Sequence, residues 1–117
     1  MAKRSEKNSL KIALMDKLKS KHRDEEARVW LAIARMLERD RVVNVSKIAG
    51  LCTKGETCAV PGKVLGKGDI DFGVSVAAFN FSEKAREKII GGGGECLSFE
   101  ELMIKNPKGS GVKILGG

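Results

Sequence analysis

The apolar positions in the first third of the chain have the spacing of two amphipathic helices. Leucines recur every four residues from Leu10 to Leu18, which predicts a helix from about Lys7 to Lys21 with lysine-rich outer faces. A second helix is predicted to start at the acidic run Asp24–Glu26, and Trp30 on its inner face is expected to anchor the core. The joint between the two helices is short, so they should form an αα-hairpin.

Three further helices are short and are recognised by the signals at their ends. The first is predicted to be capped by Asn44 or Ser46. The second follows the capping residue Ser82, and the third opens with a capping box in which Ser98 precedes Glu101 by three residues. All three are expected to alternate with extended segments.

The extended segments are also short, and they are rich in β-prone residues. Two are predicted at residues 57–60 and 63–66, separated by a turn at Pro61-Gly62. The strongest strand candidate is Val74–Phe81, which is nearly continuously apolar, as expected for a strand covered on both faces. Residues 112–115 are expected to form the last strand.

These elements predict one compact α/β domain in a chain of 117 residues. We expect an α/β core over residues 56–117, with residues 1–55 forming a basic helical N-terminal extension packed on it. Within the core, the four glycines Gly91–Gly94 predict a flexible connection. A content of 42% hydrophobic and 32% charged residues agrees with a folded, soluble protein.

The charge adds a candidate partner to this picture. The net charge is +7, the pI is near 9.5, and residues 1–23 hold eight Lys or Arg against two acidic residues, a net of +6. Such a distribution favours a nucleic acid first and an acidic membrane surface second. The basic residues expected to face phosphates in this segment are Lys3, Arg4, Lys7 and Lys11. Aromatic residues make up only 4%, so stacking platforms for single-stranded bases are scarce.

The sequence lacks the residue patterns expected for a metal site, for nucleophilic catalysis and for a membrane span. The three cysteines do not have the spacing of a zinc ribbon, and the single histidine, His22, lies far from them in sequence. We therefore expect reduced thiols in a cytoplasmic protein, with no metal and no cofactor. No nucleophile–base pair is recognisable, which argues against an enzyme. No signal peptide and no apolar run long enough to span a bilayer is seen.

The stretch "VPGKVLGKGD", Val60 to Asp69, is the most distinctive motif. A phosphate-binding P-loop needs four residues between its glycines and a Ser or Thr after the lysine, but Gly62 and Gly66 are separated by three and Gly68 follows Lys67. Glycines also let a backbone approach an RNA phosphate closely, with lysines such as Lys63 beside it. Spacing alone leaves a plain turn and an RNA contact equally open.

Several segments together resemble the archaeal and eukaryotic large-subunit ribosomal protein family eighteen-e, related to bacterial large-subunit protein fifteen. The segments are "VVNVSKI", "VPGKVLGKG", "VSVAAFNFSEKAREKI" and "NPKGSGVKIL", in this order along nearly the whole chain. "LERDRVVN" is shorter than the basic loop usual in that family, and the tetraglycine is unusual for it.

The resemblance implies short β-β-α units in an irregular superhelix preceded by helices, and a structural, non-enzymatic role in the large subunit. The implied partners are rRNA and neighbouring ribosomal proteins, without a membrane or a small-molecule substrate, and the protein would be a monomer within the ribosome. The positions that match basic or polar family positions are Arg41, Asn44, Lys47, Lys63, Lys67 and Lys108. Two readings from other classes remain: a small nucleotide-binding enzyme that uses residues 60–69, and a basic adaptor for an acidic protein.

Overall fold

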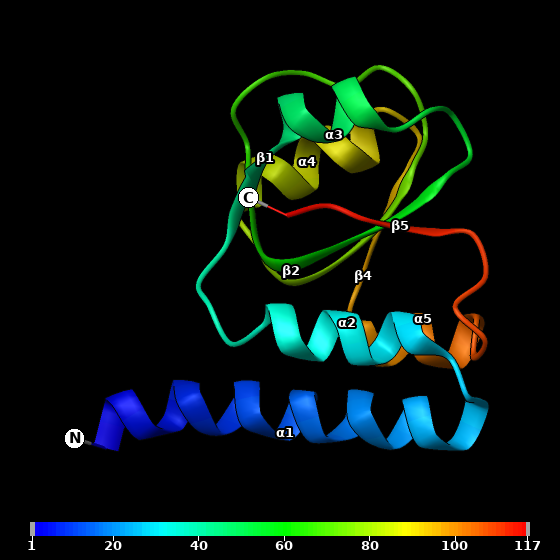
Figure 1. Ribbon diagram of the computed structural model, residues 1–117. Helices are drawn as coiled ribbons and strands as arrows, with labels where there is room; N and C mark the ends of the chain where they lie inside the picture. The colour runs from blue at the N-terminus through cyan, green and yellow to red at the C-terminus, as the bar shows by residue number, and fades with distance from the viewer. Residues whose placement is uncertain (1, 117) are drawn as a thin grey trace.

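The structure is a computed structural model that describes residues 2–116, with side chains from residue 9 onwards (Figure 1). The described residues form five helices: α1 (Ala2–Glu25), α2 (Arg28–Met36), α3 (Val45–Leu51), α4 (Glu83–Gly91) and α5 (Phe99–Lys105). They also form five strands: β1 (Val42–Asn44), β2 (Thr57–Leu65), β3 (Ser75–Phe81), β4 (Glu95–Leu97) and β5 (Val112–Ile114).

All strand pairs are parallel, and β2 is the strand on which the sheet is built. One edge of β2 pairs with β3, which in turn pairs with β4. The other edge is shared, because β5 pairs with Thr57–Ala59 in the first part of β2 and β1 pairs with Lys63–Leu65 in its last part. Two short strands therefore complete one edge of a longer one.

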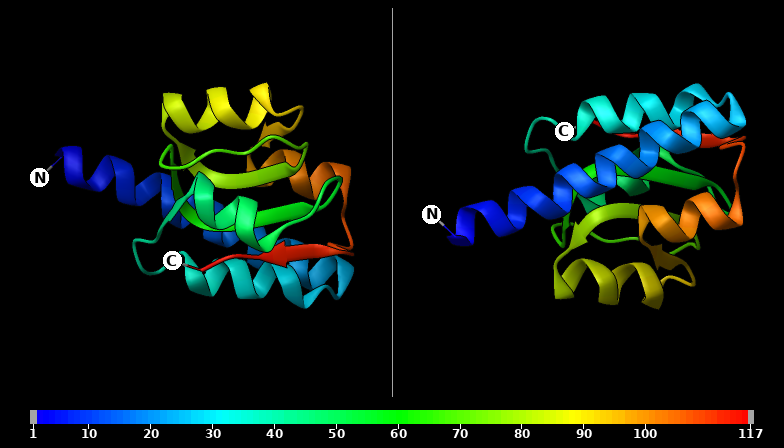
Figure 2. Two further views of the ribbon diagram at one scale, coloured as in Figure 1. Left: turned by 90° about the horizontal axis from the view of Figure 1, so that it is seen from above. Right: turned by 90° about the horizontal axis from the view of Figure 1, so that it is seen from below.

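Helices cover both faces of this sheet (Figure 1). Helices α3 and α4 lie on one face, while α2 and α5 lie on the other, with α1 packed beneath both of them (Figure 2). Side chains of β3 alternate accordingly, since Val76 and Ala78 join the core on the α3–α4 face and Ala77 joins the core on the opposite face. A near-continuous apolar run in β3 is what this two-sided burial requires.

The α/β class and the helical N-terminal segment are confirmed. The αα-hairpin is also confirmed, but its joint lies later than predicted: Asp24 and Glu25 end α1, and Glu26, at φ = 54°, turns the chain into α2. Trp30 is the predicted core anchor, fully buried, and its indole Nε1 donates to the carbonyl oxygen of Pro107 at 2.7 Å. That bond joins α2 to the segment after α5.

The predicted turn at Pro61-Gly62 is wrong, because β2 runs through both residues as one strand. The pairing with β3 shifts register between Val60 and Lys63, so the two residues form a β-bulge. Proline has no N–H to donate, and here it lies in the gap between the parts of β2 that pair with β5 and β1. At Gly62 a Cβ would lie 2.2 Å from the Arg41 carbonyl oxygen, so the chain entering β1 approaches as closely as glycine permits.

The tetraglycine does not form the loose connection that its composition predicts. A Cβ at Gly94 would lie 2.2 Å from the Val74 carbonyl oxygen, and one at Gly92 would lie 2.9 Å from that of Ile70. The amide of Gly94 also donates to the carbonyl of Ile89 in the last turn of α4. These glycines let backbone pack on backbone between α4 and β4.

The strand Val74–Phe81 and the last strand are confirmed, as are the Ser82 cap and the Ser98–Glu101 capping box. Strands β1 and β4 were not predicted, because each has three residues and no alternating pattern. Residues 42–51 of the predicted N-terminal extension contribute β1 and α3 to the sheet and its cover.

The close approach at Gly62 leads to a stability prediction. Gly62→Ala should lower the free energy of unfolding by about 1–3 kcal/mol, because the new methyl group has to displace the backbone of Arg41. The matched control is Gly50→Ala in α3, where a Cβ would meet nothing within 4 Å. That change should raise stability by about 0.5–1 kcal/mol. Urea denaturation measures both, and equal stability of the two variants would contradict the packing described here.

Candidate nucleic-acid interface

A basic cleft opens where α1, the α2–β1 connection and the later parts of β2 and β3 meet. We define the basic cleft by its polar and glycine lining, which consists of Lys11, Arg39, Asp40, Arg41, Gly62, Lys63 and Asn80. Its volume is about 240 Å³, which is below the usual size of small-molecule sites. Four cations and a single carboxylate line it, so its field is positive.

The four cations of the basic cleft are held differently. Lys11 donates to Asp40 at 2.9 Å, and the Arg41 Nε donates to the carbonyl oxygen of Met36 at 3.0 Å, which fixes these side chains on the protein. Arg39 and Lys63 are exposed, and neither side chain makes an ion pair within the part of the chain that the structure describes. The charges of Arg39 and Lys63 are therefore exposed to solvent, next to the two hydrogen-bonded cations Lys11 and Arg41.

The glycine-rich segment after β2 folds inward onto two helices. The carbonyl of Lys67 accepts from the amide of Ser46 at 3.0 Å, at the start of α3. The carbonyls of Gly66 and Gly68 both accept from the Lys88 ammonium of α4. The Ser46 amide and the Lys88 ammonium, which could have bound an anion, are thus hydrogen-bonded to backbone carbonyls. The Lys67 side chain is left exposed. This arrangement does not form a nucleotide phosphate cradle, which needs N–H groups directed at the ligand.

The glycines of this segment are required by the fold itself. Gly68 has φ = 95°, and a Cβ there would lie 2.4 Å from that of Ser46. A Cβ at Gly66 would lie 2.7 Å from that of Lys84 in α4. The predicted cap of α3 is corrected in the same place: Asn44 holds the N-cap position without a side-chain capping bond, and the loop carbonyl at residue 67 supplies the acceptor.

The predicted contact residues fall into two neighbouring groups and several separate positions. Lys11, Arg41, Gly62 and Lys63 share the basic cleft. The carboxyl-terminal end of the β1–β2 pair holds the second group, which consists of Asn44, Lys47, Gly66 and Lys67. Lys47 in this group donates to the Gly116 carbonyl at 2.6 Å. The side chains of Lys3, Arg4 and Lys7 lie outside the described residues.

Lys108 is not brought together with the other predicted contacts. It pairs with Glu25 at 3.7 Å, at the last residue of α1. Glu25 is 14 residues beyond Lys11, which corresponds to about 21 Å along the helix. Any contact made by Lys108 therefore belongs to the opposite end of the molecule from the basic cleft.

The predicted contacts did not include three basic or amide side chains of these surfaces. Arg39 and Asn80 line the basic cleft, and Lys88 holds the glycine-rich segment. Arg39 lies two residues from Arg41 in a basic segment, a signal that the sequence does contain. Asn80 and Lys88 have no local sequence signal, because their place depends on how β3 and α4 pack beside β2.

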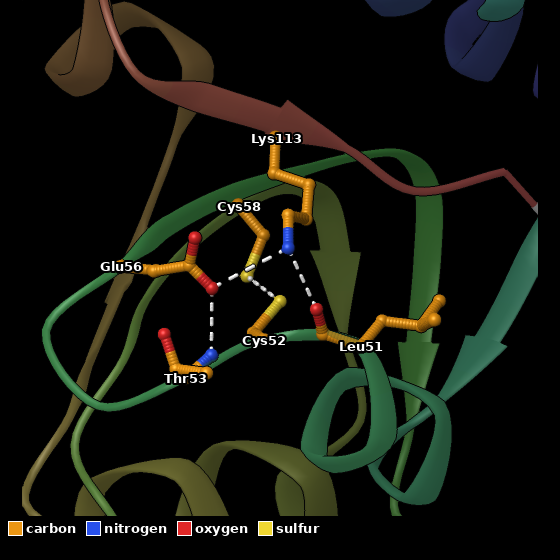
Figure 3. A network of polar contacts seen from close by, with 6 residues as sticks. All are labelled: Leu51, Cys52, Thr53, Glu56, Cys58 and Lys113. Carbon is orange, nitrogen blue, oxygen red and sulfur yellow. Dashed lines mark hydrogen bonds and ion pairs between the residues drawn. The ribbon is translucent and has the colours of Figure 1, made fainter.

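A separate polar network ties the C-terminal strand to α3 (Figure 3). The Lys113 ammonium donates to the carbonyl oxygen of Leu51 at 2.7 Å and lies 3.4 Å from the Glu56 carboxylate. Glu56 also accepts from the amide of Thr53 at 2.6 Å, and this bond is the main reason its pKa is lowered. The network closes the turn between α3 and β2.

Two buried thiols lie beneath that network (Figure 3). The sulfur atoms of Cys52 and Cys58 are 3.1 Å apart, and the two residues do not form a disulfide. Burial raises the pKa of the Cys58 thiol, so it stays protonated at neutral pH. Cys96 is likewise not part of a disulfide, and it is half-buried.

Over the described residues, no group of three or more His, Cys, Asp or Glu side chains is placed to hold a metal ion. In that same part of the chain, no helix is both long and apolar enough to cross a membrane.

Comparison with known proteins agrees with the motif resemblance. A family model described as "Ribosomal protein 60S L18 and 50S L18e" matches residues 1–117. The chain belongs to this family. The resemblance drawn from the sequence motifs is therefore confirmed, and the match extends over both groups of predicted contact residues.

Individual members of the L18e family cover the chain at similar identity. The large ribosomal subunit protein eL18 of Methanospirillum hungatei is 45% identical over 98% of this chain and 99% of its own length. The eL18 protein of Methanoregula boonei is 50% identical over 84% of each chain. That of Archaeoglobus fulgidus is 47% identical over 89% of this chain and 92% of its own length.

The role of Lys88 in holding the glycine-rich segment can be tested directly. Lys88→Met should speed amide exchange in residues 66–69, since the carbonyls at 66 and 68 lose their shared donor. Lys84→Met is the matched control, because it removes an exposed ammonium from the same helix and keeps the atoms that pack on Gly66. Hydrogen exchange followed by mass spectrometry measures both variants. Unchanged exchange in Lys88→Met would mean that packing alone holds the segment.

Proposed function

We propose that this chain is a structural constituent of the large ribosomal subunit that binds rRNA through the basic cleft and the adjoining glycine-rich segment. Membership of the L18e family and the names of its relatives support the first part. The observation that carries the second is the basic cleft, in which Arg39 and Lys63 are exposed beside two fixed cations. Its ligand is a polyanion, and its setting is the ribosome in the cytoplasm.

The mechanism is neutralisation of the phosphate backbone by a preformed surface. Lys11 and Arg41 are held by hydrogen bonds within the protein, so little side-chain entropy is lost when phosphates approach them. Exposed cations that meet phosphates displace condensed counterions, which gives binding its salt dependence. The α/β sheet holds the α1, β1 and β2 contributions in register.

The proposed contacts with described side chains lie in the basic cleft and along the adjoining edge of the sheet, except Lys108 at the opposite end of the molecule. The proposed rRNA-contacting residues are Lys3, Arg4, Lys7, Lys11, Arg41, Asn44, Lys47, Gly62, Lys63, Gly66, Lys67 and Lys108, to which we add Arg39. The glycines act here by permitting close packing within the protein, which sets the position of the lysines beside them. The proposal includes no catalytic step, in agreement with a family of structural ribosomal proteins.

Assembly into the subunit is tested by sedimentation. An epitope-tagged chain is expressed in an archaeon that has an L18e protein of its own. It should sediment with large subunits in a sucrose gradient and stay bound to them after a moderate salt wash. The matched control is the same tag on an unrelated small basic protein, which should be washed off. Recovery only at the top of the gradient would refute the role in the large subunit.

The role of the basic cleft is tested by the salt dependence of binding to large-subunit rRNA. Replacing Arg39 and Lys63 together by glutamine should reduce the log–log salt slope by about 1.5, because two phosphate contacts are lost. The control replaces the exposed residues Arg28 and Lys54, which removes the same charge away from the basic cleft. Filter binding or fluorescence anisotropy across a salt series gives both slopes. Equal slopes for the two double variants would exclude a specific role of the basic cleft.

A further inference from the structure

The apolar stripe of α1 continues beyond the part that the rest of the protein buries. Leu14 and Leu18 are buried, but Leu10, one turn earlier on the same face, is 63% exposed. Leu10 borders a cavity of about 340 Å³ whose apolar lining also includes Leu14, Phe79 and Phe99. An apolar cavity with an exposed leucine at its mouth presents surface that another apolar group would cover.

This cavity lies beside a free stretch of sheet edge. Strand β4 pairs with β3 only at Ser75–Ala77, while β3 continues to Phe81. The carbonyl of Val74 accepts from the amide of Glu95, so the backbone groups of alternate residues from 74 onwards face the β4 side. Beyond Ala77, no strand of the described chain pairs with β3 on this side.

A second, more polar hollow at the same edge extends to Arg86 of α4. It is lined by Phe81, Arg86 and Glu101 and shares Ala78–Asn80 and Ser98 with the apolar cavity. The Arg86 guanidinium lies over the Phe81 ring, 5.1 Å from its centre. The free edge of β3 is therefore flanked by an apolar hollow on the α1 side and a polar one on the α4 side.

We propose that the free edge of β3, Ala78–Phe81, pairs with an extended segment of a neighbouring protein in the large subunit. The side chains of an added strand alternate between the two faces of the sheet. One apolar side chain then enters the cavity beside Leu10, and its neighbours in sequence face Arg86 and Glu101. The occupant is a polypeptide with alternating apolar and polar residues. This inference rests on the proposed function only in that the partner belongs to the subunit.

Charge argues for a protein at this edge in place of rRNA. The apolar cavity has no Lys or Arg in its described lining, and its one ionisable residue is Glu100, which repels phosphate. The basic cleft, on the other side of Phe79 and Asn80, has four cations. Among the described residues that line the two hollows at this edge, Arg86 is the one cation, and Glu100 and Glu101 oppose its charge. Unpaired edges of this kind are the usual templates for strand addition.

The first test is photo-crosslinking in assembled large subunits. Leu10 is replaced by the photoreactive residue p-benzoylphenylalanine, and Ile12, which is 56% exposed and borders none of the hollows described here, is replaced in a matched control. The Leu10 probe should form an adduct with one discrete segment of a ribosomal protein. An adduct with rRNA alone, or the same adduct from both positions, overturns the proposal.

The second test needs no substitution in the protein. Amide exchange of Ala78 and Asn80, whose backbone groups face the free edge, is compared between the free chain and the unmodified large subunit. Strand addition predicts at least tenfold slower exchange at these amides in the subunit, beyond that seen in Gly50, an exposed position on the opposite face. Unchanged exchange overturns the pairing even if the crosslink forms. Because sedimentation of the tagged chain is scored separately, a chain that sediments correctly and fails here refutes this inference alone.

Discussion

The architecture depends on β2 remaining one continuous strand through Pro61 and Gly62. Because the strand does not turn there, its first part stays available to β5 and its last part to β1, and both join the sheet on the same edge. The β-bulge at these two residues shifts the pairing with β3, and Gly62 lets the carbonyl of Arg41 come close enough for the amide of Lys63 to donate to it at 2.9 Å. Arg41 and Lys63 are thereby fixed side by side, and so the basic cleft is formed by the same contact that completes the sheet.

Some basic side chains of this molecule are hydrogen-bonded within the protein, whereas others are exposed without a partner among the described residues. Lys88 and Lys113 satisfy backbone carbonyls, so these two ammonium groups are used within the protein. Arg39 and Lys63 have no such task among the described residues. A net charge does not distinguish these roles, and counting lysines along the chain overstates the number that an RNA can reach. Among the described residues, the exposed cations of the basic cleft form a small positive surface. It lies beside the apolar cavity, whose one ionisable residue in the described lining is Glu100.

Elements with a local signal were predictable from the sequence. Helix periodicity located α1 and α2, and the side-chain caps at Ser82 and Ser98 located α4 and α5. The bulge in β2 and the strands β1 and β4 were not predictable, because their conformation is decided by partners distant in sequence. Composition was misleading at the glycines for the same reason: flexibility is a property of an isolated segment, whereas Gly62, Gly68 and Gly94 are each pressed against another backbone. The candidate contacts divide similarly, since Lys11, Arg41 and Lys63 were named from sequence and Asn80 required the sheet.

The position of β5 has a consequence for how the chain acquires its structure. Its residues are synthesised after those of every other described helix and strand, yet they pair with Thr57–Ala59 at the centre of the sheet and pack in the same core as α1 and α2. The native sheet is thus incomplete until residues 112–114 have left the translating ribosome. Strand pairings that span such long separations also make folding slow. The sheet is therefore completed by β5, which can pair with Thr57–Ala59 only after all the other described strands have been synthesised.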